Sequence, residues 1–216
     1  MEENKDAKKR KAYTIDDHVV SKVSDIDFSG TYSYANYLRW EIEERLEIIK
    51  GKIFPLAAPN ALHQGVSGEI FFGLRSYLMG KQCKVFAAPF DVRFSGKSKA
   101  DEDIFTVVQP DICVICDTEK IDIKGCLGAP DLMVEILSTG NSRKELKIKY
   151  QLYQEFGVRE YWIVDPKRKS FMKYVLNDQA LYDEGQIYKE DYFVSDILPG
   201  FRLNIAEVFV YLEIKD

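Results

Sequence analysis

One charged residue stands inside an apolar run and limits the folds that this chain can adopt. In the segment DLMVEILS, residues 131–138, Glu135 follows Val134 and precedes Ile136. The run is short and rich in apolar and β-branched residues, so it predicts a buried β-strand. A buried carboxylate is costly unless it is paired with a cation or bound to a metal ion. The fold must therefore bring a partner to Glu135 from another segment.

A second carboxylate stands within another predicted strand, over residues 107–116. Asp111 follows Pro110 and opens the apolar part of this segment, which we expect to lie beside the Glu135 strand. Asp131 shares a strand face with Glu135, but the two lie about 13 Å apart and could not hold one ion together. Asp111 and Glu135 are therefore the expected ligands of Mg²⁺ or Mn²⁺, ions that favour oxygen ligands.

A lysine falls within the apolar arc of the helix expected over residues 142–156. At about 100° per residue, Lys149 lies inside this arc and Lys147 lies outside it. A lysine on a buried face is unusual without a partner, and the helix directly follows the Glu135 strand. Lys149 is therefore the expected catalytic lysine, able to stabilise developing charge, with Lys147 as the alternative. A structural salt bridge between Lys149 and Glu135, without catalysis, is the other interpretation.

The remaining segments predict a single domain that combines helices and strands, with some parallel strand pairing. The succession of strand, helix and strand over residues 131–164 predicts parallel pairing. The other predicted elements are a helix over 33–44, a hairpin over 45–57, a helix over 62–80, a strand interrupted by Pro89 over 84–94, a hairpin over 170–193 and a short helix or strand over 205–211.

Composition bounds the domain organisation and the partners. The chain has 216 residues, of which 46% are hydrophobic, enough to bury the core of one domain. We expect this domain over residues 31–216 and a flexible tail over residues 1–30. It has no apolar run long enough for a bilayer and no visible secretory signal, so we expect a cytoplasmic protein without a membrane partner. The net charge of -5 disfavours a broad nucleic-acid-binding surface.

The cysteines are expected to be plain buried residues. Cys113 and Cys116 form a C-x-x-C, but within a predicted strand, where positions three apart point to opposite faces. A zinc or redox site needs such a pair on a turn or at a helix N-terminus. Cys83 and Cys126 are interpreted in the same way, since free cysteine packs as a small hydrophobic residue.

Several segments, taken in order, resemble one bacterial family. VQPDICVICD, GAPDLMVEILS, a helix with Lys149 and Tyr153, and then GVREYWIVDP are similar to the Uma-type restriction endonuclease family, a branch of the PD-(D/E)XK nuclease superfamily. RLEIIKGKI, His63-Gln64 and FAAPFDVRF extend the resemblance over residues 35–210. It implies an α/β (α+β) fold in which a mixed β-sheet flanked by helices forms a restriction-endonuclease-like core. It also implies Mg²⁺-dependent hydrolysis of DNA phosphodiester bonds. It also implies a homodimer, because both strands of the substrate must be cut.

The resemblance assigns roles to individual residues. It implies that Asp111 and Glu135 bind the metal ion. The lysine that usually stands two residues after the acidic residue is replaced here by Leu137, and the resemblance implies that Lys149 takes its place.

Three further residues are additional candidates for the site. The resemblance implies that Glu47 supplies another acid and that His63 lines the cleft, although a buried core histidine is the alternative for His63. Asp131, like Asp91, is expected to support the site or to cap a backbone segment.

Three functions remain open from the sequence. The first is a metal-dependent DNA endonuclease, a hydrolase. The second is a non-catalytic, dimeric interaction or regulatory module of the same fold, because a fold does not define a function. The third is a phosphodiesterase that acts on RNA or a nucleotide. Metal binding through Asp111 and Glu135 distinguishes a nuclease site from a structural salt bridge.

Overall fold

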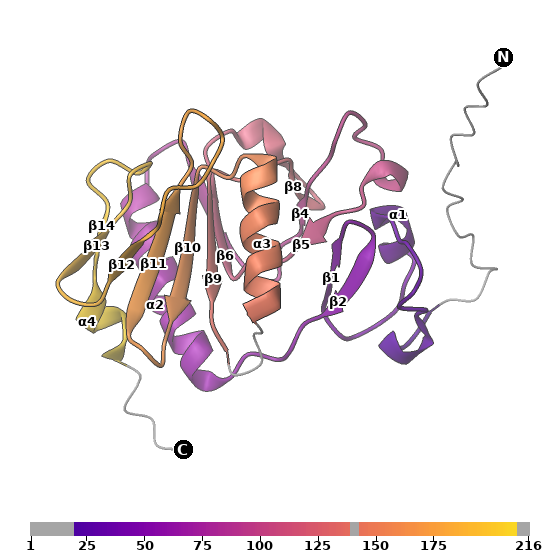
Figure 1. The fold of residues 1–216 in the computed structure, drawn as a ribbon, viewed down its shortest axis with the longest axis horizontal. Helices are drawn as coiled ribbons and strands as arrows, with labels where there is room; N and C mark the ends of the chain where they lie inside the picture. The colour runs from indigo at the N-terminus through magenta and orange to yellow at the C-terminus, as the bar shows by residue number, and fades with distance from the viewer. Residues whose placement is uncertain (1–19, 139–142, 211–216) are drawn as a thin grey trace, which may run out of the picture.

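The chain forms a mixed α+β structure that contains two six-stranded sheets and a two-stranded ribbon (Figure 1). A computed structural model describes residues 20–138 and 143–210. The predicted mixed sheet flanked by helices is confirmed.

The central sheet has the strand order β12-β11-β10-β9-β6-β3. β9 and β10 pair in parallel, and the other neighbours are antiparallel. Helix α3 (Arg143–Phe156) joins β9 to β10, so the predicted strand–helix–strand unit with parallel pairing is confirmed. The strands are β3 (Lys84–Ala87), β6 (Ile112–Ile115), β9 (Leu132–Ile136), β10 (Glu160–Asp165), β11 (Ser170–Val175) and β12 (Gln186–Tyr188).

Two helices cover opposite faces of this sheet, because successive strand residues point to opposite sides. Leu132, Val134 and Ile136 of β9 pack with α2 (Ala61–Leu78) in one apolar cluster. Met133 packs with α3 in another. In Figure 1, α3 crosses the front of the sheet and α2 lies behind it.

The second sheet lies beside the central one and has the order β2-β1-β5-β4-β8-β7. Its strands β1 and β2 form the hairpin that was predicted over residues 45–57, with Lys50 and Gly51 at the turn in the positive-φ region. The strands are β1 (Leu46–Ile49), β2 (Lys52–Pro55), β4 (Val92–Arg93), β5 (Val107–Val108), β7 (Ile121–Asp122) and β8 (Gly125–Leu127).

The C-terminal segment packs on the α2 side of the central sheet. Its ribbon, β13 (Tyr192–Val194) and β14 (Arg202–Asn204), leads into helix α4 (Ile205–Val208), so the terminal element is a helix. Phe193 packs edge-to-face on Trp162 of β10 at a ring-centroid distance of 4.6 Å. This layer covers the α2 side of the sheet and leaves the α3 side for the candidate site.

Two predicted elements are shorter than expected. The helix predicted over 33–44 is only α1 (Tyr34–Tyr37), because the chain turns after it and enters the hairpin. The strand predicted over 107–116 was wrong as one element: it divides at Pro110, which has no N–H to donate, into β5 in one sheet and β6 in the other. Short 3₁₀ turns occupy Val23–Asp25, Asp101–Asp103 and Thr118–Lys120.

The cysteine prediction was half wrong. Cys113 and Cys126 are buried and free, as expected, but Cys83 and Cys116 form a disulfide. β3 and β6 are antiparallel, with Lys84 opposite Ile115, and continuing this register by one residue places the two cysteines opposite each other. Sequence spacing alone could not indicate this pairing, since it depends on strands that are far apart in the chain.

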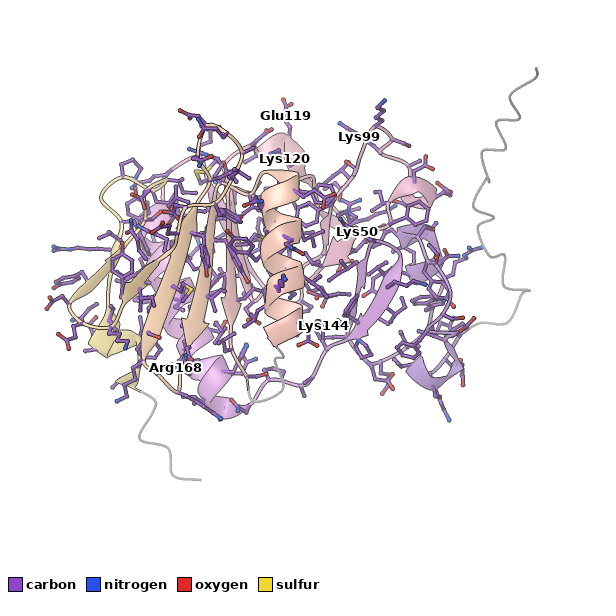
Figure 2. The ribbon with its side chains drawn as sticks, viewed as in Figure 1. Lys50, Lys99, Glu119, Lys120, Lys144 and Arg168 are labelled. Atoms are coloured by element: carbon purple, nitrogen blue, oxygen red, sulfur yellow. A yellow bond between two sulfur atoms is a disulfide. The ribbon has the colours of Figure 1, made fainter. Side chains whose placement is uncertain are left out.

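The predicted tail over residues 1–30 lies largely outside the described residues and stays a prediction. Its last part is described, and Val20 and Ile26 pack against β1 and β2. No helix in the described ranges is long and apolar enough to cross a membrane. Lys99, Glu119 and Lys144 lie exposed on the surface, the last near the start of α3 (Figure 2).

Candidate active site

Glu135 lies in the middle of β9, on the sheet face that α3 covers. Its side chain is buried, and its Oε1 accepts hydrogen bonds from Lys149 Nζ at 2.9 Å and from the Tyr153 hydroxyl at 2.5 Å. Both donors lie on α3, one helical turn apart, and therefore share a face. The helix that follows the strand thus supplies the cation that the buried carboxylate requires.

Asp111 immediately precedes β6, the strand beside the Glu135 strand β9. In the antiparallel register of β6 and β9, Ile112 is opposite Val134, and one more residue along places Asp111 opposite Glu135. Such neighbours have Cβ atoms about 5 Å apart and share a face. Asp111 Oδ2 accepts a hydrogen bond from the Ile136 backbone N–H at 2.7 Å and lies 3.2 Å from His63 Nε2.

A third carboxylate comes from the other sheet. Glu47 lies on β1, is 2% exposed, and its Oε1 accepts hydrogen bonds from Lys149 Nζ and from the Gln109 backbone N–H, each at 2.9 Å. Lys149 thus joins Glu47 and Glu135 across the space between the two sheets.

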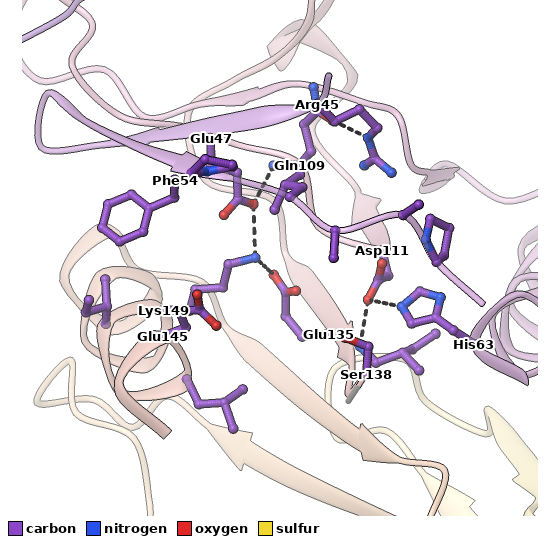
Figure 3. A pocket seen from close by; sticks show the side chains of 18 of the residues that line it. Arg45, Glu47, Phe54, His63, Gln109, Asp111, Glu135, Ser138, Glu145 and Lys149 are labelled. Carbon is purple, nitrogen blue, oxygen red and sulfur yellow. Dashed lines mark hydrogen bonds and ion pairs between the residues drawn. The ribbon is translucent and has the colours of Figure 1, made fainter. Parts of the chain in front are cut away.

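These side chains line one pocket of about 150 Å³. Figure 3 shows Lys149 between Glu47 and Glu135, with Asp111 and His63 on the other side of the pocket. The pocket is enclosed by both sheets, by α3 and by the start of α2, so it forms only when segments from much of the chain are assembled.

The pocket changes the proton affinities of its groups. Burial, together with the negative charges of Asp111 and Glu47, raises the pKa of Glu135 to about 7, against the opposing attraction of Lys149. Burial lowers the pKa of Lys149, but the adjacent carboxylates outweigh it and hold that pKa above its ordinary value. Near neutral pH, the proton that exchanges is therefore the one on Glu135, while Lys149 stays charged.

His63 is affected in the same way. Burial lowers its pKa, but the hydrogen bond to Asp111 and the charges of Asp111 and Glu135 raise it above the usual histidine value. Its Nδ1 is buried and has no hydrogen-bond partner among the described residues. The ring therefore contacts the site through Nε2, and it lines the pocket rather than serving only as a core residue.

The oxygen-rich lining fits a hard divalent cation held by two carboxylates. In the described part of the chain, no hydrogen bond reaches Asp111 Oδ1 or Glu135 Oε2, and these residues are cross-strand neighbours. No three His, Cys, Asp or Glu side chains of the described residues are gathered closely enough to hold an ion. Mg²⁺ is commonly bound by one or two carboxylates and keeps several waters, so Asp111 and Glu135 would suffice.

Two of the sequence candidates lie elsewhere. Asp131 accepts hydrogen bonds from the Cys116 backbone N–H at 2.8 Å and from Arg159, and it does not line the pocket. Lys147 lines a separate pocket with Arg168 and is not brought to the carboxylates. Of the two lysines weighed from the sequence, the structure brings Lys149 to the site.

Sequence reasoning missed Gln109, whose backbone holds Glu47 and whose side chain forms a network. Its Nε2 donates to Asp91 Oδ1 at 2.9 Å, and its Oε1 accepts from Arg45 Nε at 2.8 Å. Its place two residues before Asp111 was the available signal, but a lone glutamine carries little information without its spatial partners.

Comparisons with known proteins agree with this architecture. The Uma2 family model, described as "Putative restriction endonuclease", matches residues 34–206. A crystal structure from Anabaena variabilis, described as that of a "putative nuclease belonging to DUF820", is similar with a TM-score of 0.67 and 21% identity, covering 84% of this chain and 99% of that one. This likeness confirms the predicted fold class. No curated protein matches the chain.

Proposed function

We propose that this chain, which belongs to the Uma2 family, is a metal-dependent nuclease that hydrolyses phosphodiester bonds of DNA. The family's description, "Putative restriction endonuclease", and that of the similar Anabaena variabilis protein, "putative nuclease", support this class of reaction.

One observation carries the proposal. Three carboxylates, Glu47 of β1, Asp111 just before β6 and Glu135 of β9, line one pocket together with Lys149 of α3. A purely structural site needs only enough cation to balance its carboxylates, whereas Asp111 and Glu135 each keep an oxygen that accepts no hydrogen bond from the described residues. These oxygens are available to a ligand.

Each residue then has a distinct role. Asp111 and Glu135 would hold Mg²⁺ or Mn²⁺, and such an ion activates water and offsets charge on a scissile phosphate. Lys149, which stays protonated, would stabilise negative charge that develops on the phosphate oxygens. Glu47 positions Lys149 through the ion pair at 2.9 Å. His63 orients Asp111 through the contact at 3.2 Å.

The test is cleavage of supercoiled plasmid DNA with Mg²⁺ or Mn²⁺ by the wild type and by Glu135→Gln. The variant keeps the size of the side chain but lacks the charge, and it is expected to lose metal-dependent cleavage at least about a hundredfold. Asp131→Asn is the matched control: it also removes one carboxylate, beside the same strand but outside the pocket, and is expected to cleave like the wild type.

The possible outcomes distinguish an error in the proposed site from an error in the proposed substrate. Retained cleavage by Glu135→Gln would reject this site, and equal loss in Asp131→Asn would attribute the effect to folding. No cleavage of DNA by the wild type would reject the proposed substrate, and the same assay with RNA then tests the phosphodiesterase alternative.

A non-catalytic module is the second candidate, and one observation favours it. Lys149 already forms ion pairs with both Glu47 and Glu135, as a structural bridge would. Calorimetric titration with Mn²⁺ distinguishes the two functions, since a structural bridge has no use for the ion and Asp111→Asn would then change nothing. The homodimer stays a prediction under either function, and analytical ultracentrifugation measures it.

A further inference from the structure

Arg45 presents a positive charge beside the site and is not used in the roles above. It is partly buried, and its Nε donates a hydrogen bond to Gln109 Oε1 at 2.8 Å. Its two terminal nitrogens have neither a hydrogen-bond partner nor an ion-pair partner among the described residues. A guanidinium that is held at Nε and open at both Nη atoms can bind a planar or tetrahedral anion.

The orientation of this guanidinium is set by its surroundings. A carboxylate only accepts hydrogen bonds, so the contact of Gln109 Nε2 with Asp91 Oδ1 turns the Gln109 oxygen toward Arg45. Asp91 is held in turn by the Tyr34 hydroxyl at 3.0 Å. The Arg45 carbonyl also accepts a hydrogen bond from the Leu56 backbone N–H, which continues the β1–β2 pairing. Both ends of the residue are therefore fixed before any ligand binds.

Arg45 lies where two pockets meet. It lines the pocket of the carboxylates and also a second pocket of about 170 Å³, and Asp111 and His63 line both. The second pocket continues along the first turns of α2, where Gln64 and Ser67 offer polar side chains. Figure 3 shows Arg45 on the Asp111 side of the site, across from Lys149.

The charge of the second pocket suits an anion. Asp111 is the one carboxylate among its described lining residues, and Arg45 is not neutralised by an ion pair with it. Lys149, by contrast, is neutralised by two carboxylates. A phosphodiester strand that passes through the carboxylate pocket would therefore meet an open cation on leaving it.

We propose that the second pocket binds a phosphate of the DNA strand next to the scissile one, and that Arg45 is its cationic ligand through both terminal nitrogens. This inference rests on the proposed nuclease function and adds a substrate-binding residue to it. Gln64 and Ser67 line the same pocket and would lie along the path of this DNA strand.

The experiment measures binding of a fluorescent DNA duplex in Mg²⁺, with every protein carrying Glu135→Gln to block cleavage. Arg45→Gln is expected to weaken binding about tenfold and to reduce the slope of log K against log salt by about 0.9, the loss of one phosphate contact. Arg39→Gln is the matched control, because Arg39 is exposed and bonded only to the Ala35 carbonyl among the described residues. It is expected to change neither quantity.

Unchanged affinity and slope in a folded Arg45→Gln protein would overturn the inference while leaving the nuclease proposal intact. If circular dichroism shows that Arg45→Gln does not fold, Arg45→Lys decides instead. This variant keeps the charge but lacks the two-pronged donor, so weaker binding with the slope retained supports the inference, and binding equal to that of the parent refutes it. Failure of the parent to bind DNA at all would reject the proposed function and this inference together.

Discussion

Replacing Lys149 with Met removes the cation that contacts two buried carboxylates, Glu47 and Glu135. Methionine fits the apolar arc of α3, so little packing energy is lost. The loss of stability comes instead from leaving the buried carboxylates without their cation. Removing one partner of a buried ion pair costs about 3–5 kcal/mol. The Lys149 side chain is 12% exposed, which favours the lower end. We therefore expect a loss of about 3 kcal/mol at pH 8.

The loss of folding stability in Lys149→Met should depend on pH, and the direction of this dependence follows from the pKa of Glu135. Its native pKa of about 7 lies above the ordinary 4.5, so its contribution to stability is present at low pH and is lost as pH rises through 7. Without Lys149 this pKa rises further, because the lysine charge lowers it. The variant then continues to lose stability above pH 7, where the wild type has levelled off. Lys149→Met should therefore be about 1 kcal/mol less destabilising at pH 6 than at pH 8.

Urea unfolding, followed by the fluorescence of Trp40 and Trp162, measures both quantities at pH 6, 7 and 8. Lys147→Met is the control, since it makes the same change at an exposed position on the same helix and should stay within about 0.5 kcal/mol of the wild type. Plasmid cleavage by Lys149→Met should fall about a hundredfold. Equal destabilisation by the two variants, or a loss of stability that is the same at pH 6 and pH 8, would show that Lys149 does not stabilise the ionised Glu135.

Two further predictions concern Glu135. Affinity for Mn²⁺ should rise as pH increases through about 7 and then level off, because Glu135 must lose its proton to bind a cation; calorimetric titration at pH 6, 7 and 8 measures this, and equal affinities would contradict it. Tyr153→Phe removes a hydroxyl that donates to Glu135 and lowers its pKa. It should move the midpoint of that profile to higher pH and cost about 1–2 kcal/mol at pH 8, whereas an unchanged midpoint would show that the hydroxyl does not support the ionised carboxylate.

Local pattern was enough to predict the central part of the fold and one of its charged contacts. An apolar run around Glu135 implies a buried strand, and the arc of the following helix places Lys149 on its inner face. The structure has both elements and the hydrogen bond between them at 2.9 Å. These inferences succeed because a strand and the helix that directly follows it pack together over a short loop.

Other features depended on contacts between distant segments. The helix predicted over 33–44 ends at Tyr37, and the strand predicted over 107–116 divides between two sheets. Local propensity could not reveal either outcome, since each depends on which sheet the next segment joins. The Cys83–Cys116 disulfide is a similar case, because the register of β3 and β6 places the two residues together.

The apolar residues around Glu135 are sufficient to predict that its carboxylate is buried and needs a charged partner, because an unpaired buried carboxylate is costly. The sequence also determined which sheet faces are apolar, through the alternation of side chains along each strand. Three other features could be seen only in the folded chain: Glu47 from the second sheet shares Lys149 with Glu135, His63 contacts Asp111, and the terminal nitrogens of Arg45 are open beside them. The contacts of His63 with Asp111 and of Glu47 with Lys149 join residues 48 and 102 positions apart, and at such separations the register and packing of whole sheets, and not local preference, decide which side chains meet.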